Sequence, residues 1–175
     1  MKFLTVFLFL FSIASHAGDG HHHHHKKKKR HHKAHEHGSG KLSLATSGNE
    51  LEIEFEIPGH DIVGFEHKAS TKEQKSKVAS AVQFLKNSAA NIELPKSSSC
   101  VIDEVEVETE YHGDHSEFHI EYEYDCANIS KLSYVKVLSF GQFKGMTKLK
   151  ARGVTDSGQF SKTITAKSPK FDLVK

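Results

Sequence analysis

Histidine is the residue whose number and spacing in this chain could do chemistry. There are 15 histidines among 175 residues, and a neutral imidazole nitrogen is a good ligand for Zn²⁺ and related divalent ions near neutral pH. Three of them, His112, His115 and His119, form an H-x2-H-x3-H pattern in the segment HGDHSEFH. Because this segment crosses a turn and enters a strand, we expect the three rings to converge on one metal ion.

Further candidate ligands lie in the segment PGHDIVGFEH, which we expect to be an irregular link after a glutamate-rich strand. Its donors are His60, Glu66 and His67. If that strand neighbours the one that carries His119, these groups could complete a tetrahedral site with nitrogen and oxygen ligands at about 2.0–2.2 Å. Histidines that are merely solvated on turns are the alternative interpretation.

Nine more histidines, His35 and His37 among them, stand in residues 18–40 beside the run KKKKR. This segment has no large apolar residue, so it cannot bury enough surface to offset the entropy of ordering, and we expect a disordered arm. Its closely spaced imidazoles offer many weak, exchangeable metal sites. The same arm could instead adhere to anionic lipid or a polyanion through its positive charge. An engineered tag is a further alternative for its five consecutive histidines.

The first 17 residues have the features of a secretory signal peptide. Met1-Lys2 precedes an apolar run that is too short to span a bilayer, and small residues come before Gly18. No second apolar run of about 18 residues follows, so we expect no membrane-spanning segment in the mature chain. Export to an oxidising compartment predicts a disulfide between Cys100 and Cys126. A thiolate metal site and a catalytic cysteine are the competing interpretations.

Hydrophobic periodicity predicts an α+β fold over residues 41–175, mostly antiparallel β-sheet with about seven strands and one amphipathic helix. The strands are expected near residues 42–46, 51–57, 101–110, 118–124, 132–140, 147–154 and 159–166. The helix is expected at about 71–88, with a capping box formed by Ser70 and Glu73.

Glutamates alternate with apolar residues along three of these strands. We interpret their faces as solvated, and like charges along a strand also discourage aggregation through its edge. His119 should share such a face with Glu117 and Glu121, because side chains at i and i+2 of a strand point the same way. Residues 50–58 also resemble residues 117–125, which is either an internal repeat or the pattern that any two alternating strands share.

The distribution of charge and the absence of common motifs exclude several classes of protein. The formal net charge is +2, but the excess of lysine and arginine sits in the arm, which argues against a uniformly basic nucleic-acid-binding domain. The length argues against a large multidomain enzyme. The sequence has no GxSxG, P-loop or HExxH motif and no GxGxxG after a strand, so we expect no enzymatic activity. A metallohydrolase would need three protein ligands, an open position and a nearby base.

Several of these segments together resemble the ZrgA-like family of periplasmic zinc-uptake accessory proteins. They are His35-Glu36-His37-Gly38 before the first strand, the GFEH that ends at His67, and His115 ahead of an aromatic strand between Cys100 and Cys126. The resemblance covers about residues 35–175 and implies a secreted zinc-binding protein that assists an importer. It implies His35, His37, His67 and His115 as ligands. The chain departs from the family pattern at Lys68-Ala69, because a proline is usual two residues after the GFEH histidine.

The leading hypothesis is therefore a periplasmic protein that binds zinc and passes it on by ligand exchange, with an importer's binding protein as partner. The expected ligands are His35, His37, His60, Glu66, His67, His112, His115 and His119. The alternative hypothesis is a cationic-tail module for anionic lipid or polyanion, in which metal binding is incidental.

Overall fold

The structure is a computed structural model, and it describes residues 36–173. Within this part of the chain, no helix combines the length and the apolar character needed to cross a membrane. The predicted signal peptide, residues 18–35 of the predicted arm and the candidate ligand His35 lie outside the described residues.

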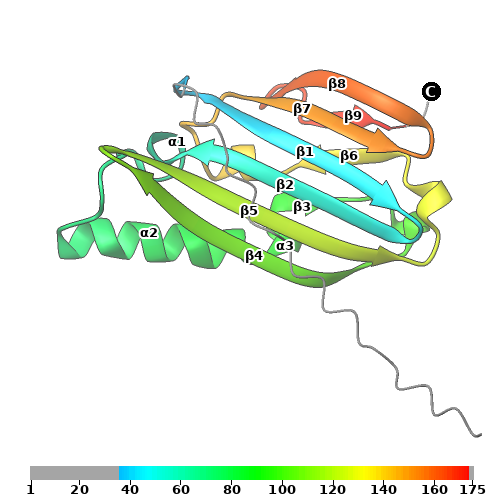
Figure 1. Cartoon of the computed structure of the whole chain (residues 1–175), viewed down its shortest axis with the longest axis horizontal. Helices are drawn as coiled ribbons and strands as arrows, with labels where there is room; N and C mark the ends of the chain where they lie inside the picture. The colour runs from blue at the N-terminus through cyan, green and yellow to red at the C-terminus, as the bar shows by residue number, and fades with distance from the viewer. Residues whose placement is uncertain (1–35, 174–175) are drawn as a thin grey trace, which may run out of the picture. The chain divides into compact units, whose positions relative to one another are not determined.

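Two β-sheets form the framework (Figure 1). The larger has six strands in the order β4-β5-β2-β1-β7-β8, and the smaller has three in the order β3-β6-β9. Neighbours are antiparallel except β1 and β7, which run parallel. The strands are β1 (Ser39–Ser47), β2 (Glu50–Pro58), β3 (Ile92–Glu93), β4 (Cys100–His112), β5 (His115–Cys126), β6 (Tyr134–Val137), β7 (Lys148–Thr155), β8 (Gly158–Thr165) and β9 (Lys170–Asp172). The α+β class with mainly antiparallel sheet is confirmed, and the described part has nine strands where about seven are predicted.

The alternating sequence places apolar side chains on one face of the large sheet. Leu51, Ile53 and Phe55 of β2 are almost fully buried, whereas the glutamates between them are half-buried on the opposite, outer face. The buried face packs with the small sheet and the helix α2 (Lys72–Leu85) in one hydrophobic cluster. Figure 1 shows α2 next to β4 and the small sheet behind the large one. Burial of apolar surface, at roughly 25 cal/mol per Å², is the main force that holds these layers together.

The amphipathic helix α2 lies inside the predicted range but has a different cap. The hydroxyl of Thr71 accepts a 3.2 Å hydrogen bond from the Gln74 backbone N–H, and the Gln74 side-chain oxygen accepts one of 3.2 Å from the Thr71 N–H. The capping box is therefore Thr71 with Gln74, and the predicted box of Ser70 with Glu73 is wrong. Glutamine serves because the box needs only a side-chain oxygen at this position.

Several shorter segments differ from the prediction. The expected irregular link after β2 contains a helix, α1 (Gly59–Val63), and α2 is followed by another, α3 (Ser88–Asn91). The strand expected over residues 132–140 shortens to β6, and a 3-10 turn over Ser139–Gly141 follows it. Segments this short carry too few periodic positions for a pattern to identify them.

The internal resemblance has a structural counterpart at the centre of the large sheet. β2 and β5 are antiparallel neighbours, and Glu54 pairs with Glu121, the residue to which the sequence repeat aligns it. Each strand is the second of a hairpin, β1–β2 and β4–β5. The four strands β4-β5-β2-β1 therefore follow a local two-fold axis through this pair. The axis brings the two glutamate-rich strands side by side.

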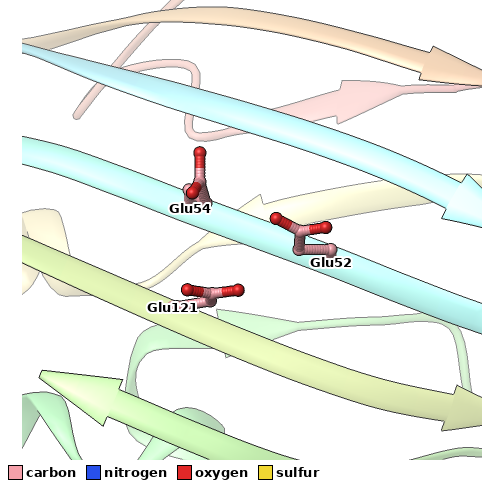
Figure 2. A group of neighbouring side chains, drawn as sticks. All are labelled: Glu52, Glu54 and Glu121. Carbon is pink, nitrogen blue, oxygen red and sulfur yellow. The ribbon is translucent and has the colours of Figure 1, made fainter. Parts of the chain in front are cut away.

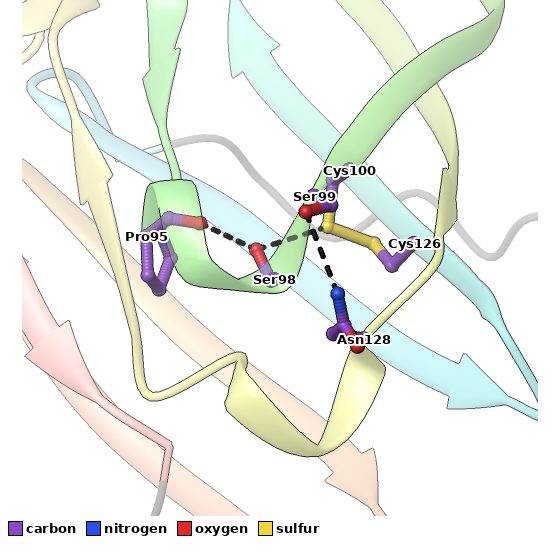
Figure 3. Close-up of a disulfide and its surroundings, with 6 residues drawn as sticks. All are labelled: Pro95, Ser98, Ser99, Cys100, Cys126 and Asn128. Carbon is purple, nitrogen blue, oxygen red and sulfur yellow. Dashed lines mark hydrogen bonds between the residues drawn. A yellow bond between two sulfur atoms is a disulfide. The ribbon is translucent and has the colours of Figure 1, made fainter.

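The predicted disulfide joins Cys100 at the start of β4 to Cys126 at the end of β5 (Figure 3). The two cysteines are direct register partners, so the bond clamps the open end of the β4–β5 hairpin. Ser98 lies beside the disulfide, with its hydroxyl 3.3 Å from the Cys100 sulfur and donating to the Pro95 carbonyl at 2.6 Å. With both sulfurs oxidised, neither cysteine is a thiolate ligand or a nucleophile, and those competing interpretations are wrong.

Candidate metal centre

Four candidate ligands from three separate segments lie at one end of the large sheet. His37 precedes β1, His60 and Glu66 follow β2, and His115 begins β5. The ends of these strands coincide because β2 is the antiparallel neighbour of both β1 and β5. We call these four residues the loop-end cluster.

The carboxylate of Glu66 joins two imidazoles of this cluster. His37 donates from Nε2 to Oε1 at 2.8 Å, and His115 donates from Nδ1 to Oε2 at 2.6 Å. Burial works to raise the pKa of Glu66, but the hydrogen bonds from His115 and His37 together outweigh it and hold that pKa below its ordinary value. Glu66 is thus an ionised carboxylate with an imidazole on each oxygen. Nitrogen and oxygen donors of this kind suit Zn²⁺.

The helix α1 supports the cluster through His60 and Asp61. The rings of His60 and His37 stack, with centroids 4.5 Å apart and planes 5° from parallel. Asp61 is buried, and its Oδ1 accepts a 2.8 Å hydrogen bond from the Gly38 N–H, which fixes the turn that carries His37. The same oxygen lies 3.6 Å from His60 Nδ1. Asp61 therefore holds the turn that carries His37 and lies within ion-pair distance of the His60 ring.

The surroundings of the second carboxylate oxygen of Asp61 indicate whether a cation fits in the loop-end cluster. Asp61 Oδ2 is buried and has no hydrogen-bond partner among the described residues. An unsatisfied buried group costs on the order of 1–3 kcal/mol, and more when it is charged. A divalent cation in the neighbouring cluster would reduce this cost. The buried carboxylate and the donor set both fit Zn²⁺.

His67 is directed to the start of α2. Its Nε2 lies 2.9 Å from the side-chain nitrogen of Gln74. The Gln74 oxygen accepts from the backbone N–H groups of Ser70 and Thr71, so its amide nitrogen must donate to His67. A ring nitrogen that accepts is unprotonated. The lone pair of His67 Nε2 is therefore directed to Gln74 and away from the loop-end cluster.

The three histidines of the H-x2-H-x3-H pattern divide between two clusters. His112 and His115 are register partners at the β4–β5 turn, but His115 turns to the loop-end cluster while His112 Nε2 lies 3.3 Å from Glu110 Oε2. His119 lies farther along β5 on the outer face, with Nε2 3.3 Å from Glu117 Oε2 and 3.6 Å from Glu110 Oε2. We call Glu110, His112, Glu117 and His119 the outer-face cluster. Two neighbouring groups thus stand where the sequence predicts one.

Carboxylates continue along the outer face beyond His119. Figure 2 shows Glu52 and Glu54 of β2 beside Glu121 of β5, and these three each offer an oxygen within 4.8 Å of the others. Burial, and then the charges of Glu52, Glu54, Glu123 and Glu106, raise the pKa of Glu121 to about 7. The interpretation of this face as simply solvated is therefore incomplete, because its like charges are crowded enough to retain a proton near neutral pH.

Cations border this acidic surface on β1 and β7. Lys41 pairs with Glu56, its register partner on β2. Lys148 and Lys150 pair with Glu36 at 2.7 and 3.2 Å, and their hydrogen bonds lower the pKa of Glu36. The outer face is therefore divided, with carboxylates over β4, β5 and β2 and cations over β1 and β7.

The structure brings together half of the predicted ligands. His37, His60, Glu66 and His115 lie in one cluster, whereas His67, His112 and His119 have other neighbours. Sequence reasoning misses Asp61, Gln74 and Glu110. A charged residue directly after His60, at the start of an otherwise apolar stretch, is a signal for Asp61. Spacing holds no signal for Glu110, because its approach to His119 depends on the register of β4 against β5.

Comparison with known proteins gives a family match. The profile of a family described as ZrgA family zinc uptake protein matches residues 34–173, which include every described residue. No curated protein matches the chain. The family match therefore covers both clusters and most of the chain.

Proposed function

Since the chain belongs to the ZrgA family of zinc uptake proteins, we propose that it binds Zn²⁺ in the periplasm at the loop-end cluster and delivers it to an importer. His37, Glu66 and His115 bind the ion, and His60 lies beside His37 as a fourth donor. Ligand exchange moves the ion, and no chemical bond of a substrate is made or broken.

The observation that carries this proposal is one carboxylate shared by imidazoles that lie 29 and 49 residues from it in sequence. The fold brings these three side chains together, since their spacing in the sequence does not. Each shared proton lies between a nitrogen and an oxygen, where Zn²⁺ would take its place, so binding releases protons and weakens in acid.

Distances show what must move when the ion binds. Tetrahedral bonds of 2.0–2.1 Å place neighbouring ligand atoms about 3.3–3.4 Å apart, whereas the His37–Glu66 and His115–Glu66 pairs are 2.8 and 2.6 Å long. The imidazoles must therefore withdraw from Glu66 by about 0.5–0.8 Å. They must also approach each other, because they lie on different oxygens of Glu66 and the ligand atoms of the three residues do not all lie within 4.8 Å of one another. Their side chains are 56% and 62% exposed, so they can make this movement and release the ion again.

Chemical unfolding of the full chain with and without zinc tests the loop-end cluster. Only sites that the folded state assembles raise stability, because contiguous histidines bind metal in the folded and unfolded chain alike. At a free zinc concentration 100 times Kd, one such site adds about 2.7 kcal/mol to the free energy of unfolding. Glu66→Gln should weaken binding at least tenfold and so remove about 1.4 kcal/mol of this gain.

The matched control is Glu104→Gln, which makes the same change on β4 at an exposed position away from the loop-end cluster. It should keep the whole zinc effect. Equal zinc effects in Glu66→Gln and in the unchanged protein would contradict the proposed site. Delivery is tested by mixing the zinc-loaded protein with the metal-free binding protein of a zinc importer, where transfer faster than zinc release into buffer supports it.

A further inference from the structure

Exposed lysines gather on the helix α2 without carboxylate partners. We call them the lysine patch, and its members lie just before, along and just after the helix: Lys68, Lys72, Lys75, Lys77 and Lys86. None of them makes an ion pair with another of the described residues. By contrast, three lysines on β1 and β7 pair with glutamates, namely Lys41, Lys148 and Lys150. The positive charge of the patch is therefore not neutralised within residues 36–173.

The lysines near the start of α2 do not stabilise the helix. Lys72 and Lys75 lie in its first turn, where the helix macrodipole is positive and disfavours cations. Lys68 and Lys77 add positive charge close to the same turn, and Glu73 is the only acidic residue of the helix. Positive charge placed against the helix dipole indicates a role in attracting an anionic surface outside the chain.

The lysine patch and the carboxylates of the large sheet lie on opposite sides of that sheet. α2 packs through Ala81 and Leu85 into the hydrophobic cluster on the buried face. The glutamates of β2, β4 and β5 alternate with the apolar residues and project from the outer face. An anionic surface therefore attracts the side that carries α2 and repels the outer face, so the protein approaches such a surface in one orientation.

The composition of the patch favours a lipid surface over a protein partner. Protein–protein interfaces are enriched in aromatic residues, methionine and arginine and depleted in lysine. The exposed positions of α2 include lysine, serine, alanine and glutamine, but no aromatic residue, methionine or arginine. Clusters of four to eight basic residues on a helix are instead typical of segments that bind anionic lipid headgroups.

We propose that the lysine patch docks the protein on the surface of an anionic phospholipid bilayer. The contact is electrostatic, with the lysine ammonium groups at the headgroup phosphates and no side chain in the hydrocarbon region. The start of α2 contacts His67, the residue that follows Glu66, and lies at the same end of the large sheet as α1 (Figure 1). Docking therefore holds the loop-end cluster close to the bilayer in which an importer would lie. This last consequence rests on the proposed function, whereas the binding of lipid does not.

Co-sedimentation of the full chain with lipid vesicles tests the proposal. The vesicles consist of phosphatidylcholine alone or of phosphatidylcholine mixed with anionic phosphatidylglycerol, in about 0.1 M salt, where the screening length is about 10 Å. The triple variant Lys72→Gln, Lys75→Gln, Lys77→Gln should bind the anionic vesicles at least about tenfold more weakly, because each lysine near such a surface strengthens binding roughly fivefold. These side chains are exposed, so their replacement is compatible with folding.

The matched control is Lys96→Gln, Lys131→Gln, Lys167→Gln, which removes the same charge from exposed positions outside α2. Both variants keep the basic residues of segment 18–35, so any contribution of that segment is the same in each. Equal binding of the two variants to anionic vesicles overturns the docking site, as does equal binding of the unchanged protein to both kinds of vesicle.

A protein partner for the lysine patch gives a different result. The α2 variant would then bind vesicles like the control but pass zinc more slowly to the binding protein of a zinc importer, and this outcome overturns lipid docking. The zinc site is tested separately, because Glu66→Gln changes the effect of zinc on unfolding and leaves the lysine patch intact.

Discussion

The loop-end cluster and the outer-face cluster use the same two kinds of side chain in different proportions, three imidazoles to one carboxylate at the loop end and two to two on the outer face. At the loop end, one carboxylate lies between imidazoles, held at hydrogen-bond distances of 2.6 and 2.8 Å. On the outer face, one imidazole lies between carboxylates, at 3.3 and 3.6 Å. The first cluster is assembled from segments at or next to the ends of strands, and the second from the register of two neighbouring strands.

This difference should appear in the choice of metal. Imidazole suits Zn²⁺ and Cu²⁺, whereas carboxylate also accepts harder ions such as Mn²⁺. We therefore expect the loop-end cluster to prefer Zn²⁺ over harder ions such as Mn²⁺, but not over Cu²⁺. The exposed imidazoles of the loop-end cluster are suited to capture and release of the ion.

The largest expected effect comes from breaking the disulfide, because β5 carries donors of both clusters. Replacing Cys100 and Cys126 together by serine should lower the free energy of unfolding by about 3 kcal/mol, as the loss of a crosslink between residues 26 apart implies. The contacts within the outer-face cluster should weaken more than those within the loop-end cluster, because the outer-face cluster spans β4 and β5. Urea unfolding with and without zinc measures both effects, and an unchanged midpoint would show that the register alone holds this hairpin.

The next effect concerns the support of the loop-end cluster by Asp61. Asp61→Ala should cost about 2 kcal/mol, because the buried Gly38 N–H loses its acceptor. It should also weaken zinc binding at the loop end by about tenfold to a hundredfold. Asp61→Asn is the control, since its amide oxygen can still accept from Gly38. If both variants bind zinc like the unchanged protein, Asp61 does not position the loop-end imidazoles.

The two clusters also differ in how far the sequence predicts them. Alternation in β2 and β5 predicts which residues face outward, and so places His119 beside Glu117. It does not predict that Glu110 joins them, because alternation within one strand does not say which strand lies beside it. The unbroken pairing of β4 with β5 from Glu104 to His112 brings Glu110 opposite Glu117.

The loop end is predicted by residue type, not by periodicity. His37, His60, Glu66 and His115 are chosen as donors from their chemistry and from family resemblance, and their meeting follows only from strand order. The same reasoning cannot foresee that His67 turns to Gln74, because that contact depends on a capping box one residue away from the predicted one. Short elements such as α1 and β9 escape prediction for the same reason, since tertiary contacts define them.

A smaller effect concerns the crowded carboxylates of the outer face. The pKa of Glu121 is raised to about 7 in the folded protein, from 4.5. Because the fold disfavours the charged form, the contribution of Glu121 to stability is most favourable below pH 4.5, falls as the pH rises from 4.5 to about 7, and stays constant above that. With chelator present, Glu121→Gln should remove this fall and stabilise the protein at pH 8 by about 1 kcal/mol after allowance for solvent screening.

Unfolding measured from pH 4 to 8 distinguishes this effect from a general change in packing. The advantage of Glu121→Gln should grow between pH 4.5 and 7 and then stay constant. Glu104→Gln, on the exposed edge strand, should show a weaker dependence. An advantage that is the same at every pH would mean that charge at Glu121 is not its cause.

The smallest effect lies where the acidic part of the outer face meets the cations of β1 and β7. Lys41→Gln should lower the free energy of unfolding by roughly 0.2–1 kcal/mol, because Lys41 is 62% exposed and its attraction to Glu56 is screened by water. Salt at 1 M, where the screening length is about 3 Å, should remove most of the difference. Lys144→Gln, at an exposed position, is the control. A larger loss that persists in salt would mean that Lys41 stabilises the sheet by packing its aliphatic stem. The division of charge across this face would then contribute nothing measurable to the free energy of unfolding.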